Sequence, residues 1–233
     1  LANPSCTQGQ GSSEKESRKP VIAVAFDEAF CFLYEDNLDC LREAGAVLCF
    51  FSPLHDDQLP ENISGLYLCG GYPELYAAAL SENRALCGEI RRRVCAGLPT
   101  VAECGGFLYL MQTLEDADGK EHPVCGVLNG RGFRTGRLQR FGYLTLKAEK
   151  DSLLFRKEES IPAHEFHYWD SSGNGEDLLA EKADGRTWRC GIVGESFYGG
   201  FPHLHFGGTL PMASRFAAAC ADTADKNRFS GPP

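Results

Sequence analysis

The sequence lacks a long apolar run and an excess of positive charge, and each absence excludes a class of protein. No apolar stretch approaches the roughly 20 residues that a membrane-spanning helix needs. The 233 residues include 23 Lys or Arg against 32 Asp or Glu, a formal net charge of −9. A protein that follows a nucleic-acid backbone normally carries a basic face instead. The composition therefore predicts a protein whose partners are neither membranes nor nucleic acids.

A phosphate-binding glycine loop is also missing. Gly119-Lys120 is followed by Glu121, so the G-x-x-x-x-G-K-[ST] loop that cradles nucleotide phosphates does not occur. No full G-x-G-x-x-G with a later acidic partner stands out either. We therefore expect no cofactor in this chain. Because the chain begins with Leu1 rather than Met, we also expect it to be part of a longer protein.

The eleven cysteines include no CxxC pair, so the short paired spacings of a zinc site are absent. A disulfide framework is usually even in number and found in short secreted chains. The basic start and apolar middle of a secretory signal peptide are absent as well. We therefore expect a cytoplasmic protein that binds no metal, in which most cysteines are reduced and packed as small buried hydrophobic residues.

Strand and helix patterns alternate from residue 21 onward. Residues 1–20 are rich in Ser, Gly, Pro and charge and are predicted to be a disordered linker or tail. Continuous apolar runs typical of strands covered on both faces lie at 21–26, 46–51, 65–69 and 98–103. Helices are predicted at 36–45, 80–97 and 105–114. This alternation predicts an α/β domain built on a mostly parallel sheet.

The second half of the chain is less regular. Strands are predicted at 126–136, 138–146 and in a short stretch near 192–198, and a closing helix at 211–221. No internal repeat and no second linker interrupts the pattern. We therefore predict one domain over 21–221, followed by a C-terminal tail at 222–233.

The segment around Cys104 has the form of a nucleophile elbow. A small or apolar strand runs into Cys104, and two glycines and an apolar helix follow. Such a sharp turn exposes the side chain at the carboxyl edge of a sheet and requires tiny neighbours. The helix N-terminus favours a thiolate, and the N–H of Gly105 is placed to hold an oxyanion. The alternative is a buried cysteine at a helix start, with glycines that serve only close packing.

A cysteine nucleophile needs a base, and six histidines are available. His203 and His205 lie two apart, so both face one side if the segment is extended. His164 and His167 form a second pair. A metal site at either pair lacks an evident third ligand, and we favour acid–base roles for these histidines near a thiolate.

A second pair of glycines, Gly70-Gly71, ends another predicted strand. These glycines either aim backbone N–H groups at a ligand or make an ordinary turn.

Seven segments, in order, resemble the class I (triad-type) glutamine amidotransferases, and within them the cobyric-acid-synthase-like branch. They are AFCFLYEDNLDCLREAGA, FFSPLHD, LYLCGGYPE, AECGGFLYL, RLQRFGY, HEFHY and HLHFGG. The resemblance covers about residues 21–221 and extends to the C-terminal glutaminase domains of cobyrinate-amidating synthases. It implies a flavodoxin-like three-layer α/β fold with a mostly parallel sheet.

The resemblance also implies roles for individual residues. Cys104 matches the family's nucleophile, which attacks the side-chain amide of glutamine. His203 matches the histidine that accepts the thiol proton and later donates one to the leaving ammonia. Gly71 and Gly105 fall where backbone amides form the oxyanion hole. Arg137 is matched to a contact with the α-carboxylate of glutamine.

One departure from the family pattern concerns the residue that orients the catalytic histidine. Many triad amidotransferases carry a Glu two residues after that histidine, and this chain has His205 there. The base then works in a Cys–His dyad or takes another acid, for which Glu103 and Glu165 are candidates. His164 and His167 are further auxiliary candidates.

The second departure is a missing domain. Full synthetases of this branch are ligases of cobalamin biosynthesis, and the resemblance implies an N-terminal domain that uses ATP and Mg²⁺ to phosphorylate carboxylates of cobyrinic acid, a corrinoid. A homodimer is compatible with the resemblance.

Two alternatives to a glutaminase domain stay open. The chain is either a non-catalytic domain that docks the synthetase and encloses its substrate, or an amidotransferase of the same branch that acts on a different acid, such as a cell-wall lipid intermediate.

Overall fold

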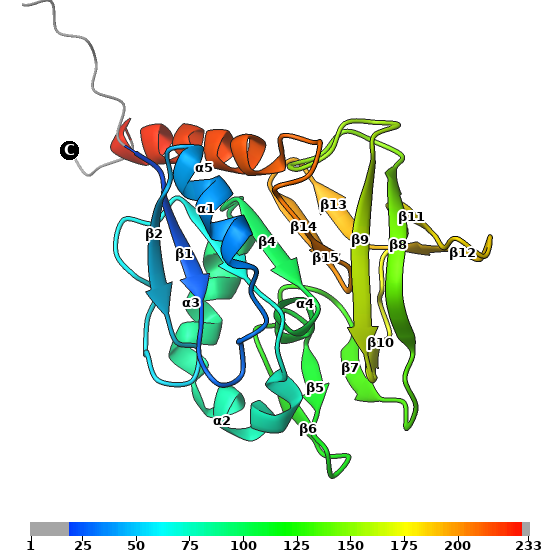
Figure 1. Cartoon of the computed structure of the whole chain (residues 1–233). Coiled ribbons are helices and arrows are strands. Elements are labelled where there is room, and N and C mark those ends of the chain that lie inside the picture. The colour runs from blue at the N-terminus through cyan, green and yellow to red at the C-terminus, as the bar shows by residue number, and fades with distance from the viewer. Residues whose placement is uncertain (1–18, 230–233) are drawn as a thin grey trace, which may run out of the picture.

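A six-stranded sheet with helices on both faces forms one side of the molecule, and antiparallel strands form the other (Figure 1). The computed structural model describes residues 19–229, and the side chains of residues 19–225. The predicted linker at 1–20 therefore lies outside the described residues, except for Lys19 and Pro20. The carbonyl of Pro20 accepts a hydrogen bond from Val47 N at 2.8 Å, so Pro20 already belongs to the fold.

The six-stranded sheet has the flavodoxin-like strand order. Its order is β13-β14-β4-β3-β1-β2, with every neighbouring pair parallel except β13-β14. The strands are β1 (Val21–Ala25), β2 (Val47–Phe51), β3 (Gly65–Leu68), β4 (Thr100–Glu103), β13 (Ile192–Gly194) and β14 (Phe197–Gly200). The parallel part follows the 2-1-3-4-5 order, in which ligands bind at the carboxyl edge. The predicted fold class and its first four strands are confirmed.

Helices cover both faces of this sheet. On one face α1 (Glu35–Glu43) and α5 (Met212–Phe229) pack against each other and against the sheet. The other face carries α3, with η1, α2 and α4 at its carboxyl edge (Figure 1). Their bounds are η1 (Pro73–Tyr76), α2 (Ala77–Glu82), α3 (Arg84–Cys95) and α4 (Gly105–Tyr109). The helices that position the site are therefore short and lie close to the strand ends.

Three helix predictions need correction. The helix predicted over 80–97 is broken at Asn83. The side-chain oxygen of Asn83 accepts a hydrogen bond from Leu86 N and caps the start of α3. The helix predicted over 105–114 ends at Tyr109, because the chain turns there into strand β5. The closing helix continues to Phe229, so residues 222–229 extend α5 where the sequence predicts a tail.

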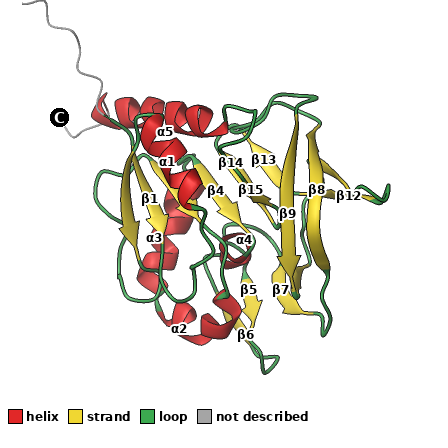
Figure 2. Cartoon of the chain, in the orientation of Figure 1, coloured by secondary structure: helices red, strands yellow, loops and turns green. Residues whose placement is uncertain are grey.

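The other half consists of two smaller sheets, which are antiparallel except for one parallel pair, β5 and β7 (Figure 2). The five-stranded sheet has the order β12 (Thr187–Cys190), β11 (Leu178–Glu181), β8 (Arg140–Ala148), β9 (Ser160–His167) and β15 (His203–Leu204). The four-stranded sheet has the order β10 (Trp169–Ser171), β7 (Arg131–Arg134), β5 (Thr113–Glu115) and β6 (Glu121–Pro123). The strand predicted over 138–146 corresponds to β8. The strand predicted over 126–136 corresponds to the shorter β7. The single short strand predicted near 192–198 is the β13-β14 pair.

The cysteines behave largely as packing residues. All ten cysteines within residues 19–229 are free, and six are buried: Cys69, Cys87, Cys104, Cys125, Cys190 and Cys220. Cys6 lies outside the described residues. In that same described range, no group of three or more His, Cys, Asp or Glu side chains has the arrangement of a metal site, and none of the helices is long and apolar enough to cross a membrane.

An ion pair joins α5 to the strand region and makes stability depend on pH. Arg215 donates to both carboxylate oxygens of Glu159 at 2.6 and 2.8 Å, and this contact lowers the pKa of Glu159 from 4.5 to about 2 despite some burial. Glu159→Gln is expected to reduce the free energy of unfolding at pH 7 by about 1 kcal/mol. A carboxyl group whose pKa is lowered in the folded protein stabilises it fully only above the pKa of the unfolded chain. The difference in free energy of unfolding between wild type and Glu159→Gln therefore shrinks as pH falls from 4.5 toward 2.

Urea unfolding of both proteins at pH 7 and pH 3 measures this difference. Glu158→Gln is the matched control, because the neighbouring Glu158 pairs with Lys147 at an exposed site and contributes less. Equal free energies of unfolding for wild type and Glu159→Gln at pH 7 contradict the prediction.

Candidate active site

Cys104 occupies a strained turn between β4 and α4. Its φ of 47° and ψ of −102° are unfavourable for a residue with a side chain, at a cost of the order of 1–3 kcal/mol. Two backbone hydrogen bonds hold the turn: Cys104 N donates to Gly200 O at 2.8 Å, and Cys104 O accepts from Leu108 N at 3.0 Å. This is the geometry of a nucleophile elbow, as the sequence predicts.

The two glycines after Cys104 are required by close backbone approach. A Cβ on Gly106 would lie 2.2 Å from the carbonyl oxygen of Leu68, and one on Gly105 would lie 2.9 Å from Gly71 N. A Cβ on Gly71 would in turn lie 2.1 Å from Ala29 O. The turn after β3 and the turn after β4 therefore touch through their backbones, and side chains at these positions would separate them.

This contact brings two backbone donors together beside the thiol. Neither Gly71 N nor Gly105 N donates a hydrogen bond within the described part of the chain. Gly105 is the first residue of α4, where N–H groups have no partner inside the helix. Two free N–H groups from adjacent turns are the arrangement that an oxyanion hole requires.

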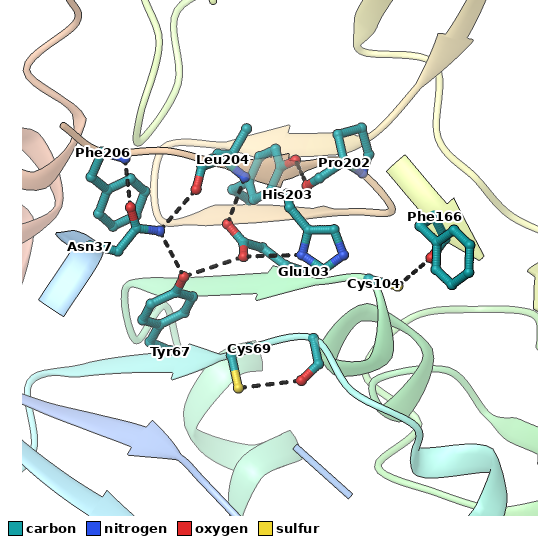
Figure 3. A network of polar contacts seen from close by, with 12 residues as sticks. Asn37, Tyr67, Cys69, Glu103, Cys104, Phe166, Pro202, His203, Leu204 and Phe206 are labelled. Atoms are coloured by element: carbon teal, nitrogen blue, oxygen red, sulfur yellow. Dashed lines mark hydrogen bonds and ion pairs between the residues drawn. The ribbon is translucent and has the colours of Figure 1, made fainter. Parts of the chain in front are cut away.

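His203 lies between Cys104 and Glu103, deep in the molecule (Figure 3). It starts β15, and its imidazole is 4% exposed and packs against Phe32, with ring centroids 4.5 Å apart. Its Nδ1 lies 3.7 Å from Glu103 Oε2, an ion-pair distance rather than a hydrogen bond. Burial lowers the pKa of His203, but the contacts with Cys104 and Glu103 outweigh it and raise the pKa to about 10. Cys104 and Glu103 therefore favour the protonated, imidazolium form of His203 beside the Cys104 sulfur.

Glu103 belongs to a closed network of buried polar groups (Figure 3). Leu204 N donates to Glu103 Oε1 at 3.1 Å, and the Tyr67 hydroxyl donates to Oε2 at 3.2 Å. Asn37 Nδ2 donates to the Tyr67 oxygen at 3.2 Å and to Leu204 O at 2.8 Å. Phe206 N donates to Asn37 Oδ1 at 2.7 Å. The network ties β3, β4, α1 and the segment after His203 into one unit.

Strand β9 lies against Cys104. Cys104 is 7% exposed, and its sulfur lies 4.0 Å from the carbonyl oxygen of Phe166. Phe166 and its neighbours on β8, Phe141 and Tyr143, are themselves exposed by between 38% and 82%. Aromatic side chains therefore line the outer approach to the site.

The remaining predicted residues lie around this centre without entering it. His205 is exposed and contacts Asp36 at 3.2 Å. His203 packs against Phe32 and His205 against Tyr34, and these two aromatic rings contact each other. His205 therefore lies at the surface beyond the buried His203. Arg137 is exposed in the β7-β8 loop. It contacts neither Cys104 nor His203 in the part of the chain that the structure describes. Its role stays a prediction.

The residues of β9 divide between two faces. His164 pairs with His203 across the β9-β15 ladder, and burial lowers the pKa of His164. Glu165 is 2% exposed, and burial raises the pKa of Glu165 to about 7. His167 stacks on Phe201 at 3.9 Å, and burial lowers the pKa of His167 to about 4. Because Glu165 and His164 alternate along β9, the Glu165 carboxylate lies on the side opposite His203.

Sequence reasoning missed Tyr67, Asn37 and Phe32 as members of the site. Tyr67 reads as one residue of an apolar strand, and Asn37 as a polar residue in the first turn of a helix. In the sequence Asn37 is one more polar residue beside Glu35, Asp36 and Asp39, and only the structure shows that it is fully buried. A buried amide needs partners, but a sequence does not show which residues provide them.

Comparisons with known proteins agree with this geometry. Residues 21–210 match the CobB/CobQ-like glutamine amidotransferase domain. The chain is 39% identical over 221 residues to a cobyrinate a,c-diamide synthase of Caldanaerobacter subterraneus, covering 91% of this chain and 49% of that protein. It is 39% identical over 202 residues to the cobyrinate a,c-diamide synthase of Dehalococcoides mccartyi, covering 84% and 43%. The chain thus spans about half the length of these relatives.

Solved structures agree on the fold. The structure of PurLQS from Thermotoga maritima aligns with a TM-score of 0.56 and 17% identity, over 91% of this chain and all of that chain. A crystal structure of a glutamine amidotransferase aligns with a TM-score of 0.58 and 17% identity, over 88% of this chain and 98% of that chain. These two structures show the fold. The match over residues 21–210 and the 39% identity to the relatives above show that the chain belongs to the CobB/CobQ-like glutamine amidotransferases.

Proposed function

We propose that this chain is the glutaminase domain of a cobyrinate a,c-diamide synthase, which releases ammonia from glutamine through a Cys104 thioester. The observation that carries the proposal is Cys104 at a strained elbow beside a buried His203 and two free backbone N–H groups. The elbow explains why a cysteine stands at this place, because packing alone gives no reason for backbone strain.

The first half of the reaction forms the thioester. The Cys104 sulfur attacks the side-chain amide carbon of glutamine, and the N–H groups of Gly71 and Gly105 stabilise the oxyanion that develops. The His203 imidazolium gives its proton to the amide nitrogen. The C–N bond then breaks, ammonia leaves, and a glutamyl thioester remains on Cys104.

The second half regenerates the enzyme. Neutral His203 takes a proton from a water molecule, and the hydroxyl attacks the thioester carbon. The same two N–H groups hold the second oxyanion. The C–S bond breaks, glutamate leaves, and Cys104 and His203 return to their starting state. One histidine thus acts as acid and then as base, which suits a buried imidazole held on one side of the sulfur.

The relatives support the assignment of the substrate that receives the ammonia. Their name describes amide formation at the a and c positions of cobyrinate, and the chain matches less than half of their length. We assign ATP and Mg²⁺ to the remaining part of such a protein, which activates the corrinoid carboxylates. In this assignment the chain's own contribution is glutamine hydrolysis and delivery of ammonia.

A glutamine analogue with a diazo-ketone group tests the glutaminase assignment in the full-length protein. Such a reagent alkylates a thiolate that binds the glutamine side chain. We expect one cysteine, Cys104, to be labelled, and glutamine to protect it. Peptide mass spectrometry locates the label.

The chain supplies its own control in Cys31 and Cys95, which are exposed and free. Iodoacetamide should label these two cysteines readily, whereas the analogue should leave them unmodified. Labelling by the analogue that spreads over Cys31 and Cys95, or that glutamine does not slow, contradicts the proposal. It would then favour a domain that only docks and encloses substrate.

A further inference from the structure

The position two residues after His203 does not provide an acid in this chain. His205 stands there and contacts Asp36 at the surface, on α1. A base that cycles between imidazole and imidazolium nonetheless works better when a carboxylate fixes its orientation and balances its charge. A carboxylate that orients His203 must therefore come from another element.

Glu103 is the carboxylate nearest to His203 in the described part of the chain. It ends β4, one residue before the nucleophile, and its oxygen lies 3.7 Å from His203 Nδ1. In Figure 3 the imidazole stands between this carboxylate and Cys104. With Nδ1 on the side of Glu103, the other ring nitrogen, Nε2, is on the side of the sulfur. Proton transfer to and from the substrate requires this orientation, in which Nδ1 faces the carboxylate and Nε2 faces the reacting sulfur.

The carboxylate of Glu103 is held from two directions. Leu204 N donates to one oxygen and the Tyr67 hydroxyl donates to the other. Every described neighbour of these oxygens is a donor, so the group is satisfied as an anion. Glu103 is 1% exposed, and Asn37 and Tyr67 are fully buried. A buried carboxylate without a cationic partner is costly, and His203 is the cationic partner that this site offers.

The same network also fixes the backbone that carries His203. Leu204 follows His203 directly, and both its N–H and its carbonyl are bound, to Glu103 and to Asn37. The ring and the main chain of this segment are therefore anchored to one carboxylate and one amide. A merely structural network would explain the backbone bonds, but it would not place a carboxylate oxygen at the ring nitrogen.

We propose that Glu103 is the positioning acid of His203, held by Tyr67 and Asn37, so that the end of β4 and the turn after it supply both the group that orients the base and the nucleophile. The inference rests on the proposed glutaminase function and names a residue for it. Glu165, the other buried candidate, lies on the opposite side of β9 and makes no contact with His203 among the described residues.

Glu103→Gln in the full-length protein tests this assignment by two readouts. The first is glutamine-dependent ammonia release, for which we expect kcat to fall by about 10²–10⁴-fold. The KM for glutamine should stay within about threefold, because Glu103 faces His203 and not the substrate. Glu165→Gln is the matched control, since it removes an equally buried carboxylate from the other face and should keep kcat within the same narrow range.

The second readout is the titration of His203 itself, followed by NMR on protein labelled in its histidines. The signal is assigned by its absence in His203→Asn. A carboxylate stabilises the imidazolium, so its removal should move the titration of His203 to lower pH by at least one unit. The other titratable groups near His203 are Cys104 in the turn after β4 and His164, Glu165 and His167 on β9, and the Glu103→Gln variant keeps all four.

Unchanged kcat together with an unchanged His203 titration in Glu103→Gln overturns the inference. If that variant does not fold, Tyr67→Phe decides, because it removes one hydrogen bond to Glu103 and keeps the carboxylate. We expect Tyr67→Phe to lower kcat by about 3–10-fold, and wild-type kcat with wild-type titration there overturns the inference as well. A wild-type protein that releases no ammonia contradicts the proposed function instead, while the titration still tests Glu103.

Discussion

Cys104→Ala is expected to abolish glutamine-dependent amidation in the full-length protein while leaving ammonia-dependent amidation intact. Removal of a covalent nucleophile eliminates the thioester route, and losses of the order of 10⁴–10⁶-fold accompany such changes. External ammonia replaces the product of this domain and bypasses the loss. The measurement compares product formation with glutamine and with ammonium salt as nitrogen donor.

Cys95→Ala is the matched control for this experiment. Cys95 is an exposed free thiol at the end of α3, and its loss should change neither rate. Equal glutamine-dependent rates in wild type and Cys104→Ala would exclude the thioester mechanism. A parallel loss of both the glutamine and the ammonia rates would point to a folding defect, which the melting temperature reveals.

Gly70→Ala should also slow glutamine hydrolysis strongly, although Gly70 contacts no substrate in the proposed mechanism. A Cβ at this position would lie 2.4 Å from His203 Cε1 and 3.3 Å from Nδ1. Because β3 is fixed in the sheet, the imidazole has to move, and displacement of a catalytic group by about 1 Å costs on the order of 10²-fold in rate. We expect that loss in glutamine-dependent ammonia release, with binding of glutamine less affected.

Gly88→Ala provides the comparison, because a Cβ on this α3 glycine meets nothing within 4 Å. It should leave the rate unchanged and stabilise the helix by up to about 1 kcal/mol. The two variants add the same methyl group, so any difference in rate reports the contact with His203. A Gly70→Ala enzyme with wild-type kcat shows that His203 does not act from the position described.

The first half of the fold and the centre of the site follow from local sequence. Buried parallel strands appear as uninterrupted apolar runs, which is why β1 to β4 are predicted well. The elbow is equally local, since Glu103 to Gly106 carry the strand end, the nucleophile and both small residues in sequence. Patterns of this kind need no knowledge of distant contacts.

What the sequence does not provide depends on contacts between distant segments. Asn37 and Leu204 are 167 residues apart, and only the folded chain brings them within 2.8 Å. Strands β10 to β12 have only three or four residues each, too few for a clear period. Strand β9 is longer, but it buries Glu165 and His167 and exposes Phe166, so its apolar residues do not mark its buried face.

The order Glu103-Cys104-Gly105 makes three neighbouring peptide units inseparable. In the proposed mechanism an orienting acid, a nucleophile and an oxyanion donor are consecutive residues, at the end of β4 and in the turn after it. Insertion or deletion of a single residue here would misdirect all three at once, whereas a loop elsewhere can change length freely. For protein engineering, the length of this segment is therefore fixed.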